Sequence, residues 1–585
     1  MMSGIMVLLA LAASDSWATS ASNSALVRRG NNAAAPNAAA CTNSTTGPVV
    51  DLNYALYAPQ VTTSPDRRTY YNFSNIRYAA PPVDSLRFQL PQDPVNSRSA
   101  GVQDGTHGKI CPQSYTPWQN TKLVTAPPGE LESEDCLFLD VVVPDQVWNQ
   151  RCNSSRPVMV WIHGGGFQIG AKWGGPMTNP LGLQDRSFDE DGGGLIWVGL
   201  NYRVSLNDSC CDILIPSRLR IVLQLGALGW LQGESFTSAG GVPNVGFQDQ
   251  RKALEWVQNY IHLFGGDASR VTIMGESAGG GSILHHITAH GGKKDAPQFQ
   301  QAILQSPAYV PRPYASQAED SFSVLLETAN VSSLADLVAL DTYDLQIANK
   351  LSQASDFYGT FQFGPAPDGS YVPDLPEKLL ASGQFHKDVK VMVAHNTFEG
   401  QKYTDPAATN SSAFDAYMRL YFPEMPEAVL EELVTSIYPP VYNDTSAFPW
   451  ATPFDRLMTA VADLTFTCHA YFAGGALGGA ENEGPPAYSY LFSVPPGTHT
   501  LDVNYSFYVN STWSTLVTNA TLAGILQGYL TAFAEAGDPN REGLPAFPVY
   551  GGGYADLNLN ATFVDVVKDP AANSRCDWWR EASYA

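Results

Sequence analysis

One short stretch constrains the fold of this chain more than any other. Four strand-forming residues, 271–274, run directly into Gly275-Glu276-Ser277-Ala278-Gly279, a G-x-S-x-G pattern. Small, helix-compatible residues follow from Gly280. This order predicts a sharp strand-to-helix turn, a nucleophile elbow, that projects the central serine out of a sheet. Glycine is expected at both ends of the pattern because a side chain there would collide across the turn.

The rest of the chain must support this motif, since a lone G-x-S-x-G carries little weight in a sequence with 50 glycines among 585 residues. Helical stretches such as 248–264 alternate with apolar, strand-like segments. Those segments are 158–162, 195–200, 271–274 and 389–394. Buried strands separated by helices predict an α/β fold with a large, mostly parallel sheet covered by helices on both faces. Residues 315–385 lack this alternation and predict a helical insertion.

Charge and composition exclude several classes of partner. The net charge is −23, which argues against nucleic acid and against an anionic membrane surface. With 44% hydrophobic residues the chain can bury a large core. No later run reaches the roughly 18 apolar residues that a membrane span requires, so no integral membrane segment is predicted.

The N-terminal region has the features of an exported protein. Residues 1–18 predict a signal peptide, although no Lys or Arg precedes the apolar run. Residues 19–47 are expected to be a flexible lead-in or a short pro-segment that ends at Arg28-Arg29, and 48–580 a single domain. Eleven N-x-S/T sequons favour a secreted glycoprotein. They are Asn43, Asn72, Asn153, Asn207, Asn330, Asn410, Asn443, Asn504, Asn510, Asn519 and Asn560.

Residues 204–224 interrupt what would otherwise be one strand-turn-helix segment. They contain the adjacent pair Cys210-Cys211. The segment begins with Val, whose codon starts with GT, and ends with Gln, whose codon can be CAG. Two explanations therefore remain open, a retained intron and a genuine surface insertion, since loops tolerate changes in length.

A serine becomes a nucleophile only when a base takes its proton and an acid orients that base. With the order serine, acid, histidine, the best candidates are Ser277, Glu399 and His499. Glu399 follows the predicted strand 389–394, and His499 follows the strand-like segment 488–494, so both are expected at strand ends. His395 and Asp405 are weaker candidates for the acid.

The other histidines fit less well. His107, His163 and His262 precede the serine, and His285, His286 and His290 lie on the helix that leaves the elbow. His286 and His290 have the i, i+4 spacing of a metal pair, but no paired acidic motif accompanies them. The eight cysteines form no C-x-x-C pair and are expected in disulfides. We therefore predict neither a metal nor an organic cofactor.

Backbone amides must be in place for the negative charge that develops when serine attacks a carbonyl group. The segment 161–167 is a strand that runs into three glycines, Gly164, Gly165 and Gly166, whose amides can approach a ligand closely. Together with the amide of Ala278, it predicts an oxyanion hole. No G-K-[S/T] follows the glycines, which excludes a phosphate-binding P-loop.

In combination, these motifs resemble the type-B carboxylesterases, the α/β-hydrolase family that includes secreted fungal esterases and lipases and the cholinesterases. The resemblance spans about residues 48–580. The matching segments are 75–82, 86–88, 133–137, 161–167, 244–250, 264–267, 275–279, 399–400 and 499–505.

The resemblance implies a triad of Ser277, Glu399 and His499 and an oxyanion hole of Gly165, Gly166 and Ala278. It also implies two disulfides, Cys111–Cys136 and Cys468–Cys576, which leaves Cys41–Cys152 by elimination only. One departure is Ser306-Pro307, where the family usually has Ser-Gly.

The implied activity is that of a secreted serine carboxylic-ester hydrolase, acting on a small-molecule or lipid ester through an acyl-enzyme. A triacylglycerol lipase is the alternative, but residues 112–135, where the family's lipases carry an apolar lid, are short and polar. Trp118 lies in this loop at the wrong distance from Cys136 for a choline-stacking residue. A non-catalytic adhesion homologue is a more distant alternative.

Overall fold

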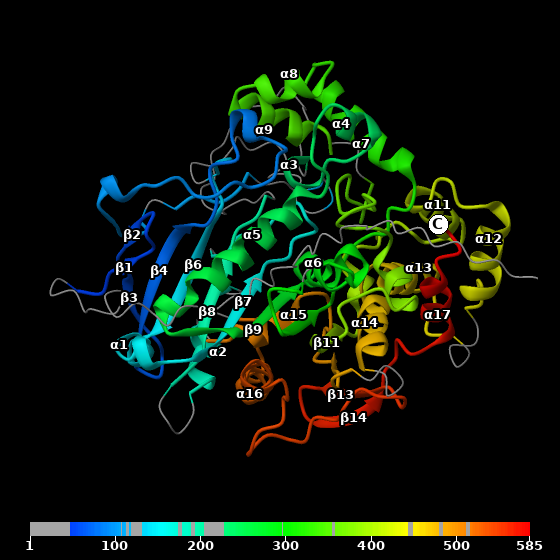
Figure 1. Ribbon diagram of the computed structural model, residues 1–585. Coiled ribbons are helices and arrows are strands. Elements are labelled where there is room, and N and C mark those ends of the chain that lie inside the picture. Colours follow the sequence, from blue (N-terminus) through cyan, green and yellow to red (C-terminus); the bar gives the residue numbers. More distant parts are fainter. Residues whose placement is uncertain are drawn as a thin grey trace, which may run out of the picture.

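The segments predicted as strands lie in one sheet of the computed structural model, which describes residues 47–106, 108–112, 116, 118, 132–173, 178–188, 193–203, 227–294, 296–353, 357–442, 448–478, 484–510 and 515–585 (Figure 1). Among these residues the sheet has 11 strands. Their spatial order is β14 (Val564–Lys568), β13 (Ala555–Leu559), β12 (Tyr488–Phe492), β11 (Lys390–Asn396), β10 (Gln301–Gln305), β9 (Gly266–Glu276), β7 (Arg156–Ile162), β8 (Ile196–Leu200), β6 (Phe138–Pro144), β4 (Thr69–Arg77) and β3 (Gln60–Thr63).

The centre of this sheet is parallel, as predicted. Each neighbouring pair from β8 through β7, β9, β10, β11 and β12 to β13 runs parallel. The pairs at the two edges, β13–β14 and β3–β4–β6–β8, are antiparallel. A separate three-stranded sheet joins β1 (Val50–Asp51), β2 (Leu56–Tyr57) and β5 (Val102–Gln103).

Successive side chains of the central strands point to opposite faces of the sheet and pack into two apolar cores, one on each face. On β7, Val158, Val160 and Ile162 point into the core that is covered by α5 (Val245–Tyr260), α6 (Ala278–Ile287) and α14 (Cys468–Gly478). Met159 and Trp161 point into the opposite core, covered by α15 (Leu501–Ser506) and α16 (Ala520–Ala536). Both faces are therefore buried, which explains why the central strands are continuously apolar instead of alternating with polar residues.

The predicted helical insertion lies between β10 and β11. It consists of α7 (Ala315–Thr328), α8 (Leu334–Ala339), α9 (Thr342–Leu351) and α10 (Pro376–Ala381). The remaining described α-helices are α1 (Asp145–Asn149), α2 (Leu181–Arg186), α3 (Ala227–Trp230), α4 (Glu234–Ser238), α11 (Ser412–Tyr421), α12 (Glu427–Glu432), α13 (Pro453–Ala462) and α17 (Ser574–Glu581). Within the described ranges, no helix is long and apolar enough to cross a membrane.

Two of the expected disulfides are present. Cys111 is bonded to Cys136, just before β6, and Cys468 at the start of α14 is bonded to Cys576 in the C-terminal helix α17. The second bond closes a separation of 108 residues and ties the end of the chain to a helix that packs on the sheet. Cys152 is also disulfide-bonded, but its expected partner Cys41 lies outside the described residues.

Several other expectations cannot be compared with the structure, because they fall outside the described residues. These are the signal peptide at 1–18, almost all of the lead-in at 19–47, the segment 204–224 and His107. One sequon does not fit a glycan. Asn504 is only 7% exposed within α15, and its side-chain amide donates to the carbonyl of Thr500, so this asparagine is unsuitable as a glycosylation site.

Candidate active site

The turn at Ser277 has the strained geometry that its sequence predicts. Strand β9 ends at Glu276, α6 begins at Ala278, and Ser277 between them has φ 55° and ψ −127°. A Cβ atom on Gly275 would lie 2.6 Å from the carbonyl carbon of Gly279. One on Gly279 would lie 2.0 Å from the carbonyl oxygen of Ile162, which is closer than any real Cβ contact. Only glycine therefore allows the first turn of α6 to reach strand β7.

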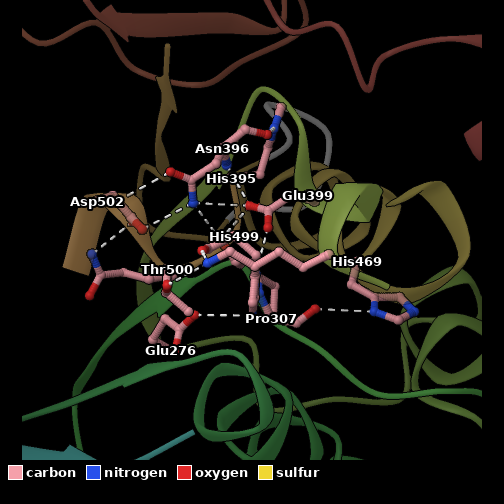
Figure 2. Close-up of polar contacts among 12 residues, drawn as sticks. Glu276, Pro307, His395, Asn396, Glu399, His469, His499, Thr500 and Asp502 are labelled. Carbon is pink, nitrogen blue, oxygen red and sulfur yellow. Dashed lines mark hydrogen bonds and ion pairs between the residues drawn. The ribbon is translucent and has the colours of Figure 1, made fainter. Parts of the chain in front are cut away.

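His499 is held in place from the side opposite the elbow (Figure 2). It follows β12 and precedes α15, and its side chain is buried. Its Nδ1 lies 2.5 Å from Oε2 of Glu399, a hydrogen bond between groups 100 residues apart. Ring contacts with Tyr403 and Phe466, at centroid distances of 5.4 and 4.4 Å, fix the plane of the imidazole.

Glu399 follows β11 directly and is fully buried. Its Oε1 accepts hydrogen bonds from the Ser306 hydroxyl at 2.6 Å and from the Asn396 backbone amide at 2.5 Å. Burial by itself would raise the pKa of this carboxyl. The charge of His499 and the hydrogen bonds from His499, Ser306 and Asn396 outweigh that effect and hold its pKa below the ordinary value. Glu399 is therefore favoured as an anion, which accepts a hydrogen bond from Nδ1–H of His499.

A second carboxylate, on Glu276, faces the opposite nitrogen of the same imidazole (Figure 2). Its Oε1 lies 3.2 Å from Nε2 of His499. Burial raises the pKa of Glu276 to about 8, and the nearby charges of Asp502 and Glu399 add to this. For His499, burial lowers the pKa, but Glu276 and Glu399 together raise it above its ordinary value. The imidazole thus lies between two buried carboxyl groups.

A third buried carboxyl group, Asp502, extends the network through amides. Asn396 Nδ2 donates to Asp502 at 3.0 Å and to Glu399 at 3.1 Å, so one side chain bridges the two acids. Gln305 Nε2 donates to Asp502 at 3.0 Å, and the Tyr490 hydroxyl donates to it at 2.9 Å. Gln305 and Asn396 end their strands, Tyr490 lies within β12, and Asp502 is in the first turn of α15, so the network joins β10, β11, β12 and α15.

The glycine loop after β7 packs directly against the elbow. A Cβ atom on Gly164 would lie 3.0 Å from Cβ of Ser277. Gly165 and Gly166 have φ values of 111° and 64°, a region that favours glycine. Among the hydrogen bonds between described residues, none is donated by the amides of Gly165, Gly166 or Ala278. These three donors therefore remain available to a ligand.

A cavity of about 420 Å³ opens at Ser277. The lining is mainly apolar and aromatic. The residues that line it are Gly166, Phe167, Ser277, Ala308, Tyr309, Val310, Arg312, Phe361, Phe363, Gly364, Pro365, Tyr403, Thr465 and Phe466. Trp118 packs against two of these residues: its ring centroid lies 5.4 Å from that of Phe361 and 5.6 Å from that of Tyr403.

The competing candidates lie elsewhere or have other partners. His395 is directed at Asp569, and Asp405 accepts from the amide of Ala407. His285 bonds to the carbonyl of Gly281. His286 lies between Tyr371 and Gln250, which leaves neither of its ring nitrogens free.

His163 and His290 are each held through Nδ1. Nδ1 of His163 bonds to the carbonyl of Gly164, and His290 bonds to the carbonyl of Ser370. Burial lowers the pKa of His163 to about 4, so this ring is neutral and supports the glycine loop. His262 lies on an exposed turn after α5, far along the chain from the network.

Sequence reasoning missed four supporting residues: Glu276, Ser306, Asn396 and Tyr403. Two of them had a signal that could have been used. Glu276 is the x of the G-x-S-x-G pattern, and Ser306 precedes the proline that departs from the family's usual Ser-Gly. Ser306 has φ 43° and still donates to Glu399. The proline therefore leaves the serine's role intact.

Comparison with known proteins identifies the family of this chain. The profile described as "Carboxylesterase family" matches residues 47–206 and 220–579. The chain belongs to the carboxylesterase family. This carboxylesterase is 36% identical over 572 residues to Carboxylesterase patB of Aspergillus clavatus, covering 92% of this chain and 96% of that protein. It is therefore a carboxylic-ester hydrolase, with esters as its substrates.

Two further relatives bear on the fold and on the substrate. The crystal structure of Aspergillus niger EstA matches with a TM-score of 0.73 and 27% identity, over 91% of this carboxylesterase and 98% of that chain. The Secreted lipase of Arthroderma benhamiae is 28% identical over 469 residues, which is 77% of this chain and 82% of that protein. The α/β-hydrolase fold is thereby established for the carboxylesterase.

The contact between Glu276 and His499 gives a prediction about proton affinity. Replacing Glu276 with Gln removes the carboxyl group 3.2 Å from Nε2, which is one of the groups that raise the pKa of His499, so that pKa should fall. NMR titration of ¹³C-labelled histidine measures this directly. Glu432→Gln, an exposed site on α12, is the matched control and should leave the titration unchanged. An unchanged His499 pKa in Glu276→Gln would mean that Glu276 is already protonated over that range.

Proposed function

We propose that the protein is a secreted serine esterase that works through an acyl-enzyme, with Ser277 as nucleophile, His499 as general base and Glu399 as the acid that orients the base. The observation that carries this proposal is the 2.5 Å hydrogen bond from Nδ1 of His499 to the buried, anionic Glu399, beside the strained serine turn. That bond fixes the tautomer in which Nε2 is an acceptor, the form required of a base.

The reaction follows from these roles. The Ser277 oxygen attacks the ester carbonyl carbon while Nε2 of His499 takes the hydroxyl proton. The tetrahedral intermediate then expels the alcohol, which receives that proton from the imidazolium. Water next attacks the acyl-enzyme, gives its proton to His499, and releases the carboxylic acid as Ser277 regains a proton. Glu399 stays ionised throughout and stabilises the imidazolium.

Three amides serve as the proposed oxyanion hole: those of Gly165, Gly166 and Ala278. Gly166 and Ser277 line the same cavity, and the amide of Ala278 is one of the donors that the start of a helix leaves without an intrahelical partner. These donors are held in place before the reaction begins. They therefore stabilise the developing charge without a reorganisation cost. The mechanism requires no metal or organic cofactor.

Secretion rests on separate observations. Residues 1–18 have the pattern of a signal peptide, the sequons are numerous, and disulfides are typical of exported proteins. The name of the Arthroderma benhamiae relative, Secreted lipase, supports the same location.

We also propose that 204–224 is additional to the family's fold, which is supported by the break in the family match between 206 and 220.

Within the family, a soluble-ester hydrolase is favoured over a lipase. The cavity at Ser277 is small and walled by aromatic rings, and the side chain of Phe361 closes on Gly166. A triacylglycerol lipase remains the second candidate because the relatives include a named lipase.

We expect kcat/KM for p-nitrophenyl esters to fall as the acyl chain lengthens from butyrate to palmitate. Phe361→Ala should relieve that fall by enlarging the cavity. Phe357→Ala, an exposed phenylalanine nearby in the chain, is the control. Wild-type activity that rises with acyl length, and rises further on emulsified triacylglycerol, would support a lipase instead.

Ser277 gives the direct test of the nucleophile. Ser277→Ala should lose esterase activity by about 10⁴-fold or more and should no longer react with a fluorophosphonate probe. Ser269→Ala removes an exposed serine from the same strand, β9, and should keep both properties. Labelling that persists in Ser277→Ala would exclude Ser277, and a wild-type protein that neither labels nor hydrolyses esters would favour the non-catalytic alternative.

Glu399 is tested against Asp405, a weaker candidate for the acid. Glu399→Gln leaves the shape of the site intact but removes the charge that selects the His499 tautomer, so kcat should fall about 10³- to 10⁴-fold. Asp405→Asn changes only a turn-capping side chain and should leave kcat within about twofold. The assignment of the acid fails if the two effects are reversed.

A further inference from the structure

A second group of ionisable side chains lies outside the cavity that Ser277 opens into. His395 is near the end of β11, Asp556 is in β13, and Asp569 follows β14. Their exposures are 2%, 0% and 3%. One nitrogen or oxygen atom from each lies within 4.8 Å of those of the other two. None of the three lines the catalytic cavity, so the proposed reaction does not account for them.

Two members of this cluster are positioned by neighbouring groups. Asp569 accepts hydrogen bonds from the Tyr550 hydroxyl and from the Ala571 amide, both at 2.6 Å. Nδ1 of His395 lies 3.1 Å from the carbonyl oxygen of Asn396, which makes Nδ1 the protonated nitrogen. Nε2 lies 3.4 Å from Asp569 Oδ1, and on losing its proton it would present a lone pair to the space between the two aspartates. Metal-binding histidines are usually oriented by this kind of bond on the far nitrogen.

Asp556 has no such support. Both of its carboxylate oxygens are buried, and neither accepts a hydrogen bond of normal geometry from the described residues. It also takes part in none of the ion pairs found between side chains of the described ranges. A buried carboxylate without a partner costs several kcal/mol. Its carboxylate is directed at the same small space as Asp569 and His395.

The charges of the cluster balance best around a divalent cation. One imidazolium would neutralise only one of the two carboxylates, so the other must either hold a proton or remain as a buried negative charge. A divalent ion together with a neutral imidazole would neutralise both, because two anionic ligands and one neutral ligand bring the total charge to zero.

The spacing of the ligands points the same way. Nε2 of His395 and Oδ1 of Asp569 are 3.4 Å apart, which is long for a hydrogen bond. Two ligands of a tetrahedral zinc ion, each about 2.1 Å from the metal, are separated by about 3.4 Å. We propose that His395, Asp556 and Asp569 form a binding site for a divalent transition-metal ion of the zinc class, with a water molecule completing its coordination.

Such an ion would act on stability, not on the chemical step. It would join the end of β11 to the β13–β14 hairpin, and β11 leads directly to Asn396 and Glu399. The hairpin is at the edge of the sheet, where β14 has a neighbour on one side only among the described strands. Metal binding would therefore hold the strand end that carries the orienting acid.

The test measures metal uptake by the full secreted chain. The protein is stripped with EDTA, dialysed, and titrated separately with Zn²⁺ and Mn²⁺, while bound metal per chain and Tm are recorded. Wild type should bind about one equivalent of one of these ions and gain Tm. Asp556→Asn keeps the shape but loses the charge, and its affinity should fall at least about tenfold. Asp565→Asn makes the same change at an exposed position on β14 and should bind as wild type does.

Cobalt gives a reading that does not depend on these two variants. Co²⁺ added to the stripped wild type should produce the visible absorption of a low-symmetry N/O site, and His395→Gln should abolish that absorption. The proposal is overturned if stripped wild type binds neither Zn²⁺ nor Mn²⁺, or if it binds them no better than Asp556→Asn. Should Asp556→Asn fail to fold, the cobalt spectrum of wild type against His395→Gln decides.

Discussion

The contact between the first turn of α6 and strand β7 is the constraint on which the rest of the site depends. It requires glycine at 279, where any Cβ atom would meet the carbonyl oxygen of Ile162. Because the helix is drawn so close, the backbone at Ser277 is pushed to a positive φ and the serine stands at the sheet's edge. The same closeness sets the amide of Ala278 beside the glycine loop that follows β7. One steric requirement therefore positions both the proposed nucleophile and its proposed anion-binding donors.

The second organising feature is electrostatic. Glu276, Glu399 and Asp502 are buried around one imidazole, and burying three carboxylates without compensation would be very costly. The three carboxyl groups differ in their affinity for a proton. Glu399 is stabilised as an anion by several hydrogen bonds, whereas burial raises the pKa of Glu276 and of Asp502. The site can therefore carry three acids because only one of them is strongly favoured in its charged form.

Much of the fold and of the catalytic candidates could be predicted from the sequence. The elbow, the central strands, Glu399 and His499 carry local signals: glycines at set spacing, apolar runs, and polar residues at the point where a strand ends. Of the supporting residues, Glu276 and Ser306 carry only an indirect signal, and Asn396 and Tyr403 carry none. Ser306 and Asn396 are ordinary polar residues in sequence, and only their convergence on Glu399 from two neighbouring strands gives them a role. Contacts of this kind depend on strand order, which local patterns do not encode.

The sequence alone therefore determined the turn, the candidates for the reacting side chains and the layers of the fold, because each of these follows from sterics and periodicity over a few residues. The tertiary structure alone decided which ionisable side chains lie close enough to change one another's pKa. Glu276 reaches His499 across 223 positions of the chain, and His395 meets Asp569 across 174. Proton affinities and metal preference arise from burial and from distance in space. They are therefore properties of the folded sheet and not of any segment within it.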